Sequence, residues 1–416
     1  MIDKLCKLTF PFLIILLSPI LVQADFGYSL DLSNAQTDNV LNDSSAVDSP
    51  IRSGAIGIQY YPISQLEFSG SFKHTLYDEI TNSDERGDTI ITDITNSVYG
   101  LNTTWIPLNP DNKTNLYFNT SFDRVKYKDS SATDYDNIIL KFMASIGYHF
   151  RPNIHLRAGT EMTSNNYLND DNIDADNIQM ELFTGVNFAL PGSNNLDIEG
   201  GFAITSLQAI EVDTFDIKPN NVDLVVPAEY LEDANIQNLY ISSRFSRSIG
   251  KKTGISLTFT YSNFTNSDKS VILDYSTSFL SPWSSFYDGT STVFKLKTYL
   301  VPTFVVTTGA GYWDKNFLRA IESIREDYEI IEIDPRSGDT IRIPTNVPWY
   351  TEPQDTKYRY EWLSSFYIDL TRPIMFREIL IEPSFSVVYK KNSSTSDAYD
   401  YSSTTFTLGL SLSGNF

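Results

Sequence analysis

Cysteine, histidine and basic tracts are scarce in this chain. Of its 416 residues one is a cysteine, Cys6, and three are histidines. A fold that depends on internal disulfides is therefore excluded, although an oxidising compartment would permit them. The net charge is −21 and no basic tract is present, which argues against nucleic-acid binding because such binding needs a basic face.

Long hydrophobic runs are also lacking beyond the N-terminus, and the mean hydropathy is −0.21, which argues against a polytopic helical membrane protein. The one long run, "LTFPFLIILLSPILV", follows Lys4 and Lys7, and the small-residue pattern "VQA" ends at Ala24. This arrangement predicts a signal peptide over residues 1–24. The alternative is a single membrane anchor, but the run is short and two prolines interrupt it.

The rest of the chain is rich in tyrosine, phenylalanine and small polar residues, arranged in short alternating segments. The clearest is "LKFMASIGYHFRPNIHLRAGTEM", in which Leu140, Phe142 and Ile146 share one face. Lys141 and His149 lie on the other face, and the turn "RPN" leads into a second alternating segment. A period of two with apolar and polar faces predicts antiparallel strands.

The same unit recurs along the chain and gives sixteen strand candidates. They are 26–33, 51–61, 66–77, 95–106, 114–127, 137–150, 154–162, 178–190, 196–205, 237–248, 255–262, 290–301, 303–313, 357–371, 378–390 and 402–416.

Short and long connections alternate between these candidates. The long polar stretches are about 34–50, 78–94, 128–136, 163–177, 206–236, 263–288, 314–356 and 391–401. Bacterial transmembrane barrels pair short periplasmic turns with long extracellular loops and use an even number of strands. The pattern predicts an all-β fold: one transmembrane antiparallel up-and-down β-barrel domain over residues 25–416. About sixteen strands are expected, with fourteen or eighteen as neighbouring possibilities.

Aromatic residues gather beside the short turns, where an aromatic girdle would meet the membrane interface. The alternative is a secreted β-sandwich whose core they would cap, but a sandwich does not need every second loop to be long. The aromatic residues in question are Tyr60, Tyr61, Trp105, Tyr148, Phe150 and Phe188.

The C-terminal segment "TFTLGLSLSGNF" alternates up to Phe416, with Leu410 and Leu412 on its apolar face, and "FGYSLDLS" alternates near the other end. Pairing of the last strand with the first would leave no open edge in lipid. The chain thus resembles Gram-negative outer-membrane β-barrel proteins of the porin-like class. In that class such an ending is recognised by the barrel-assembly machinery, so the resemblance implies an assembly signal at Phe416, Leu412 and Leu410. It also implies contact with outer-membrane lipid and lipopolysaccharide.

The final hairpin, "VVYKKNSSTSDAYDYSSTTFTLGLSLSGNF", is similar to that of barrels joined to surface-lipoprotein or polysaccharide export systems. The helical repeat domain that many of those carry is absent here.

Motifs for catalysis or cofactor binding are scarce. His149 and His155 flank one tight turn and are expected to be neighbours, without an acidic or cysteine partner at metal-site spacing. "DDNIDADNIQME" partly resembles a calcium loop, but Ala175 stands where the motif needs glycine, so we interpret it as an acidic loop. We expect no enzyme activity, cofactor or metal, although a hydrolase site scattered over loops stays an alternative.

The inward face of the barrel can be predicted from the parity of each strand. Its charges are nearly balanced, which predicts a mixed, hydrated lumen; equally, these charges could serve only as cross-strand pairs that select nothing. The candidates are Glu67, Lys73, Asp123, Lys141, Arg157, Glu161, Glu181, Asp197, Glu199, Arg244, Lys295, Lys297, Arg359, Glu361 and Glu382.

The long connection 314–356 contains Leu318, Ile321 and Ile324 at helical spacing, and could fold into or over the pore or pack on neighbouring loops. The leading functional hypothesis is a channel for passive or facilitated diffusion of small polar solutes across the outer membrane. The alternative is a structural or export-accessory envelope barrel that conducts little. Neither the solute nor the oligomeric state follows from the sequence.

Overall fold

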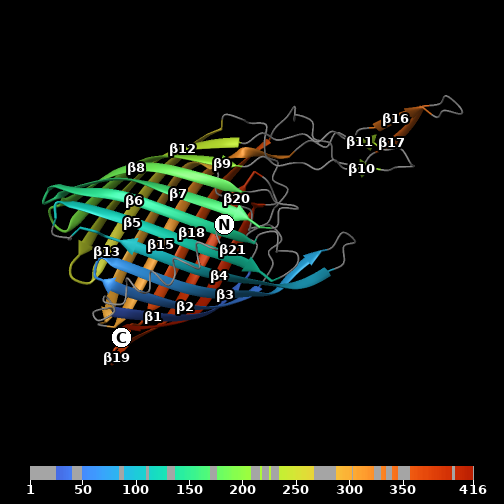
Figure 1. Cartoon of the computed structure of the whole chain (residues 1–416). Coiled ribbons are helices and arrows are strands. Elements are labelled where there is room, and N and C mark those ends of the chain that lie inside the picture. Colours follow the sequence, from blue (N-terminus) through green and yellow to red (C-terminus); the bar gives the residue numbers. More distant parts are fainter. Residues whose placement is uncertain are drawn as a thin grey trace, which may run out of the picture.

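The fold is a closed antiparallel β-barrel, seen in a computed structural model of the chain (Figure 1). The described residues are 25–39, 49–83, 89–108, 112–128, 136–168, 176–207, 216–217, 224–225, 234–266, 287–301, 303–322, 329–333, 340–344, 357–395 and 399–415. The predicted signal peptide, residues 1–24, and Phe416 lie outside these ranges.

Sixteen long strands form the wall, and each matches one predicted strand. A further strand, β19 (Ile374–Phe376), joins the same sheet by pairing with β20. The sixteen are β1 (Asp25–Thr37), β2 (Ser49–Ile63), β3 (Leu66–Ser83), β4 (Thr89–Trp105), β5 (Thr114–Tyr127), β6 (Asn137–Arg151), β7 (Ile154–Tyr167), β8 (Asn177–Leu190), β9 (Asn194–Leu207), β12 (Ala234–Ile249), β13 (Thr253–Asn266), β14 (Tyr287–Val301), β15 (Phe304–Glu322), β18 (Lys357–Thr371), β20 (Ile379–Ser394) and β21 (Tyr401–Asn415).

The barrel closes by pairing β1 with β21. Their antiparallel register runs from Gly27 opposite Asn415 to Thr37 opposite Thr405. Closure matters because an open sheet edge in hydrocarbon would leave backbone N–H and C=O groups without partners. The predicted pairing of the last strand with the first is confirmed, and Leu410 lies opposite Leu32.

Short turns and long connections alternate around the two ends of the barrel, as predicted (Figure 1). Both ends of the wall, Asp25 and Asn415, lie at the short-turn end. The predicted long connections are too long, because many strands extend into the residues that were assigned to them. For example, β3 and β4 still pair at Ser83 and Thr89, within the expected loop 78–94.

The connection 314–356 also begins later than expected. Leu318 and Ile321 belong to β15, which continues to Glu322, so their helical spacing does not correspond to a helix; Ile324 lies outside the described residues. Further along, β16 (Glu329–Ile333) and β17 (Thr340–Pro344) form a hairpin that lies beyond the loop end of the barrel in Figure 1. A second small hairpin joins β10 (Asp216–Ile217) to β11 (Leu224–Val225).

The outer face of the wall is apolar. Leu101, Leu182 and Leu408 each expose more than 60% of their surface, and apolar neighbours two residues away, such as Tyr99 and Met180, are exposed too. Such a band suits lipid, whereas a soluble β-sandwich would bury these residues. No helix among the described residues is long and apolar enough to cross a membrane. The transmembrane barrel prediction is confirmed, and with it the outer-membrane location, since closed barrels of this kind are outer-membrane structures.

Most of the predicted girdle residues lie on this outer face at the short-turn end. Trp105, Tyr148 and Phe150 are exposed there, and Trp105 stacks on Phe118 with ring centroids 5.4 Å apart. Tyr61 differs, because its hydroxyl donates a hydrogen bond to Oε1 of Gln59 at 3.3 Å. Gln59 belongs to the opposite set of positions in β2 from the exposed Ile56 and Ile58.

Candidate functional site: the charged inward face

The inward face consists of the positions that alternate with the exposed apolar ones. In β8, for instance, Met180 and Leu182 face out, so Glu181 faces in. A slip of one residue would exchange the two faces along a whole strand, so the register decides which charges line the lumen. By this register the structure places the following candidates inward: Glu67, Lys73, Asp123, Lys141, Arg157, Glu161, Glu181, Asp197, Glu199, Arg244, Lys295, Lys297, Glu361 and Glu382. Arg359 lies in β18, and its side chain is outside the described part.

Several inward residues escaped the sequence analysis. Asp31, Asp369 and Lys390 have the correct parity in their strands and could have been found by the same rule. Lys315 could not, because the alternation was expected to end at residue 313, whereas β15 continues. Tyr240 was passed over because it carries no formal charge.

The centre of the site is Arg157 on β7, which binds two carboxylates of β9. Its Nη1 is 2.9 Å from Oδ1 of Asp197, and its Nη2 is 2.8 Å from Oε2 of Glu199. Its Nε also donates to the same Glu199 oxygen at 3.0 Å. Each of the three side chains is 28–29% exposed. Both bonds to Glu199 share one carboxylate oxygen, so they are charge-assisted and fix the orientation of the guanidinium without forming the two-oxygen fork.

A glycine on the intervening strand makes this contact possible. Arg157 lies opposite Gly185 of β8, and Gly185 lies opposite Glu199 of β9. The guanidinium therefore crosses a whole strand, a distance of about 10 Å between β7 and β9. A Cβ at Gly185 would come within 3.0 Å of the Nε of Arg157, so a larger residue would lift the guanidinium off the wall.

Tyr240 also extends over a glycine, as Arg157 does, but it approaches from β12 and not from β7. It lies on β12 opposite Gly201 of β9, and its ring covers that glycine so closely that a Cβ there would overlap it. The Tyr240 hydroxyl reaches β8 and donates to Oε1 of Glu181 at 2.5 Å, with Oε1 of Glu199 at 3.3 Å. The result is a network in which Arg157 and Tyr240 approach the same carboxylate, Glu199, from opposite directions.

The two predicted neighbouring histidines do meet. His149 and His155 lie directly opposite each other on β6 and β7, with ring centroids 4.6 Å apart. Within the described ranges, no group of three or more histidine, cysteine or acidic side chains could hold a metal ion. The pair lies at the turn end of the inward face, next to Arg157 along β7.

Inward charges are separated by sign around part of the barrel. On β7–β9 four acidic side chains face inward with Arg157 among them. On β12–β15 the charged inward side chains that the structure describes are all basic. The acidic set is Glu161, Glu181, Asp197 and Glu199; the basic set is Arg244, Lys295, Lys297 and Lys315. A solute in the lumen would therefore meet mainly acidic groups along β7–β9 and basic groups along β12–β15.

The loop end of the inward face is more enclosed than the turn end. Phe317 is 5% exposed and Glu361 is 5% exposed, while Tyr127 and Tyr167 are also buried. Oε2 of Glu361 forms an ion pair with Nζ of Lys315 at 3.8 Å, and the same ammonium lies over the ring of Tyr287 at 5.1 Å. Inward side chains are therefore more tightly packed at the loop end than at the turn end.

The calcium-like segment divides into two parts. Its first part, up to Ala175, lies outside the described residues. Asp176 accepts the backbone N–H of Tyr167 at 2.5 Å, and Glu181 lies four positions into β8, in the Tyr240 network. Asp136 accepts the N–H of Tyr127 at 2.6 Å in the same way. Asp136 and Asp176 therefore complete strand ends, and the described end of the segment belongs to β8.

No family model matches the chain, and no curated protein matches it in sequence. Solved structures with a similar fold include outer-membrane proteins. OpdK of Pseudomonas aeruginosa, solved with vanillate, has 10% identity and a TM-score of 0.46, with coverage of 95% of this chain and 99% of that one. OccAB1 of Acinetobacter baumannii has 13% identity and a TM-score of 0.45, with coverage of 94% and 96%. OmpT of Vibrio cholerae has 11% identity and a TM-score of 0.40, with coverage of 95% and 99%. At these identities the likeness concerns the barrel alone.

Proposed function

We propose that this protein is a channel for passive or facilitated diffusion of small polar solutes across the outer membrane. The observation that carries the proposal is the inward face itself, which is charged along most of its strands while the outer face is apolar. Charges in a dry interior would need complete pairing. Lys141 faces inward, is exposed, and forms no ion pair with any described residue, which suits a water-filled lumen.

The size of the barrel supports the same proposal. Sixteen strands about 4.8 Å apart and tilted by about 40° close into a cylinder about 32 Å across between backbones. Arg157 and Tyr240, two of the longest side chains on this wall, lie flat over glycines and do not project toward the axis. This arrangement keeps the middle of the lumen wide enough for water and a small solute.

The test is single-channel recording of the purified protein in a planar bilayer. We expect conductance with a modest preference for cations, because the acidic arc on β7–β9 and the acidic loops outweigh the bases. The preference should fade as salt is raised, since the screening length is about 10 Å at 0.1 M. A strong anion preference at low salt would contradict this assignment of the charges.

The enclosed loop end favours a second candidate, a structural or export-accessory barrel that conducts little. The two candidates separate in a variant that lacks residues 324–355, the connection between β15 and β18. If narrowing at the loop end limits the current, this variant should conduct more than the intact protein. Silence from both forms would favour the accessory barrel. The channel proposal assigns no catalytic step to any residue, so lipid or ester hydrolysis by the purified protein would point elsewhere.

A further inference from the structure

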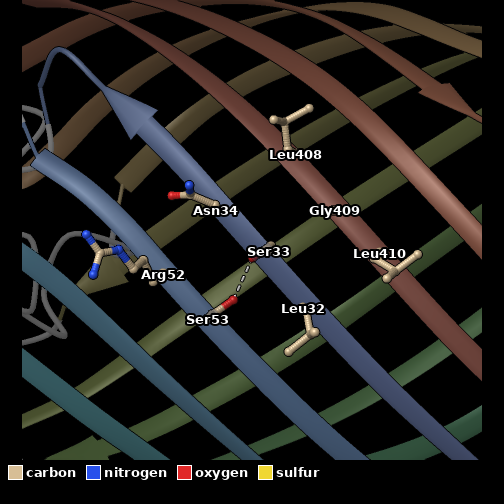
Figure 2. Close-up of a pocket in the computed structure, with 8 residues that line it drawn as sticks. All are labelled: Leu32, Ser33, Asn34, Arg52, Ser53, Leu408, Gly409 and Leu410. Carbon is tan, nitrogen blue, oxygen red and sulfur yellow. Dashed lines mark hydrogen bonds between the residues drawn. The ribbon is translucent and has the colours of Figure 1, made fainter.

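The outer face carries a groove at the seam where the barrel closes. It has a volume of about 390 Å³ and lies across β21, β1 and β2 (Figure 2). Leu32, Leu408 and Leu410 form its apolar walls, and all three belong to the lipid-facing set. The backbone of Ser33, Ser53 and Gly409 forms the floor, because the Ser33 and Ser53 hydroxyls turn to the other side and bond to each other at 2.7 Å.

A glycine on β2 lies beside Leu32, one of the residues that line the groove. Gly54 lies opposite Leu32 and belongs to the outward set of β2, between Arg52 and Ile56. A Cβ at Gly54 would make an ordinary contact of 3.5 Å with Cδ2 of Leu32. A larger residue at this position would therefore be tolerated, and it would occupy the space beside Leu32 that the groove now leaves to lipid.

A cation marks the loop-side end of the groove. Arg52 lines it, and its side chain is 63% exposed. Its Nη2 is 3.1 Å from Oδ2 of Asp78, a contact that orients the guanidinium but uses few of its five donors. Asn34 lies opposite Arg52 on β1 and adds an amide to the same end.

The height of Arg52 fits the boundary of the hydrocarbon layer. It is eleven residues from the turn end of β2 at Ile63 (63 − 52 = 11), which corresponds to about 28 Å along the barrel axis for a strand tilted by about 40°. The apolar band of such barrels is about 25 Å tall. Counting from the turn end of β2, we therefore place the leucine walls within the acyl layer and the guanidinium at the headgroups of the leaflet nearest the long loops.

We propose that this seam groove binds a phosphorylated, acylated glycolipid of the lipid A type. One acyl chain lies between Leu32 and the leucines of β21, and a headgroup phosphate accepts hydrogen bonds from Arg52 and Asn34. Arginine suits phosphate because its planar fork makes two parallel bonds. A lipid held here bridges β21, β1 and β2, so it strengthens the one place where the first and last strands must stay joined.

The experiment uses the full mature barrel, folded into detergent without lipopolysaccharide and examined by native mass spectrometry. Three probes are added at matched concentration: bis-phosphorylated lipid A, the same lipid with both phosphates removed, and phosphatidylglycerol. We expect one retained lipid A per barrel and much weaker retention of the other two. Arg52→Gln should weaken retention of lipid A by about tenfold or more, the loss expected when a charge-assisted contact is removed.

Three further variants separate the groove from simple charge attraction. Gly54→Leu keeps Arg52 but adds bulk beside Leu32 and should weaken the retention of lipid A. Leu408→Trp changes a residue that lines the groove, fills it from β21, and should lose lipid A. Lys126→Gln removes another exposed outward cation near the loop end, on β5, away from the groove, and should bind as the unaltered protein does. Heat-modifiable mobility in gels confirms that each variant is folded before it is compared.

The proposal is overturned by any of three results: equal retention of dephosphorylated lipid A or phosphatidylglycerol, unchanged binding by Arg52→Gln, or an equal loss in Lys126→Gln. Retention of lipid is measured without any current. If the barrel shows no current in recordings, the lipid site is therefore not contradicted. If lipid A is not retained, the channel proposal is not contradicted.

Discussion

Replacing Arg157 with methionine tests whether the inward network holds the wall together. The substitution keeps an unbranched stem beside Gly185, but removes the guanidinium that joins β7 to β9. Asp197 and Glu199 then lie two residues apart on the same face of β9, with no cation between them. Tyr240 still donates to Glu181, so the loss is confined to the Arg157 contacts.

The expected loss of stability follows from the exposure of the three side chains. Exposed ion pairs contribute about 0.2–1 kcal/mol, and breaking a buried pair costs about 3–5 kcal/mol. At 28–29% exposure the Arg157 contacts lie between these limits. We expect the free energy of unfolding to fall by about 2 kcal/mol, after discounting for water in the lumen.

The matched control is Lys141→Met. Lys141 also faces the lumen, on the adjacent strand β6, but forms no ion pair with the described residues, so its loss removes the same charge without breaking a contact. Stability is measured by reversible urea unfolding in lipid vesicles, and selectivity by reversal potential. Both variants should become more cation-selective, and only Arg157→Met should unfold at lower urea. Equal stability of the two variants would refute the argument from exposure and distance.

Three other predictions address topology, assembly and the shape of the lumen. Peptide tags in the long connections, near Asp84, Asp171 or Ser337, should be labelled on intact cells. Tags in the short turns, near Asn153 or Gly192, should be labelled only after the outer membrane is breached. The opposite labelling would invert the barrel. Deleting Phe416 should lower the amount of heat-modifiable barrel in the outer membrane while secretion to the periplasm continues, and normal insertion would remove its proposed role. Gly201→Val should displace the Tyr240 ring into the lumen and lower the conductance. The control Gly200→Val adds the same bulk to the lipid face of β9 and should leave the conductance unchanged. Equal currents in the two variants would show that the position of the ring does not affect the pore.

The sixteen strands could be predicted because a barrel strand in lipid has a strict requirement. Every second side chain must be apolar along the membrane span, and that requirement is visible in segments such as 140–150. The prediction lost accuracy where the requirement ends. Near their loop ends β3 and β15 continue as hydrogen-bonded strands through register shifts, so their regular alternation stops before their pairing does.

The helical spacing of Leu318 and Ile321 misled for a related reason. Spacing of three residues is weak evidence when the neighbouring strand is already in place to pair. In the structure Asn316 pairs with Tyr360, and Ala320 with Tyr358 after a register shift, so β15 continues through both residues. Backbone partners supplied by tertiary structure outweighed a short local pattern.

The sequence by itself determined the closed barrel, the division of each strand into lipid and lumen faces, and the alternation of short turns with long loops. These features follow from local periodicity, which each strand carries alone. Tertiary structure alone decided the contacts between strands, because they depend on the stagger of three strands at once. Arg157 reaches Glu199 since Gly185 lies between them in register, and Tyr240 reaches Glu181 over Gly201. The seam groove has the same origin: Leu32, Leu408 and Arg52 are far apart in the chain, and only the closing register brings them together.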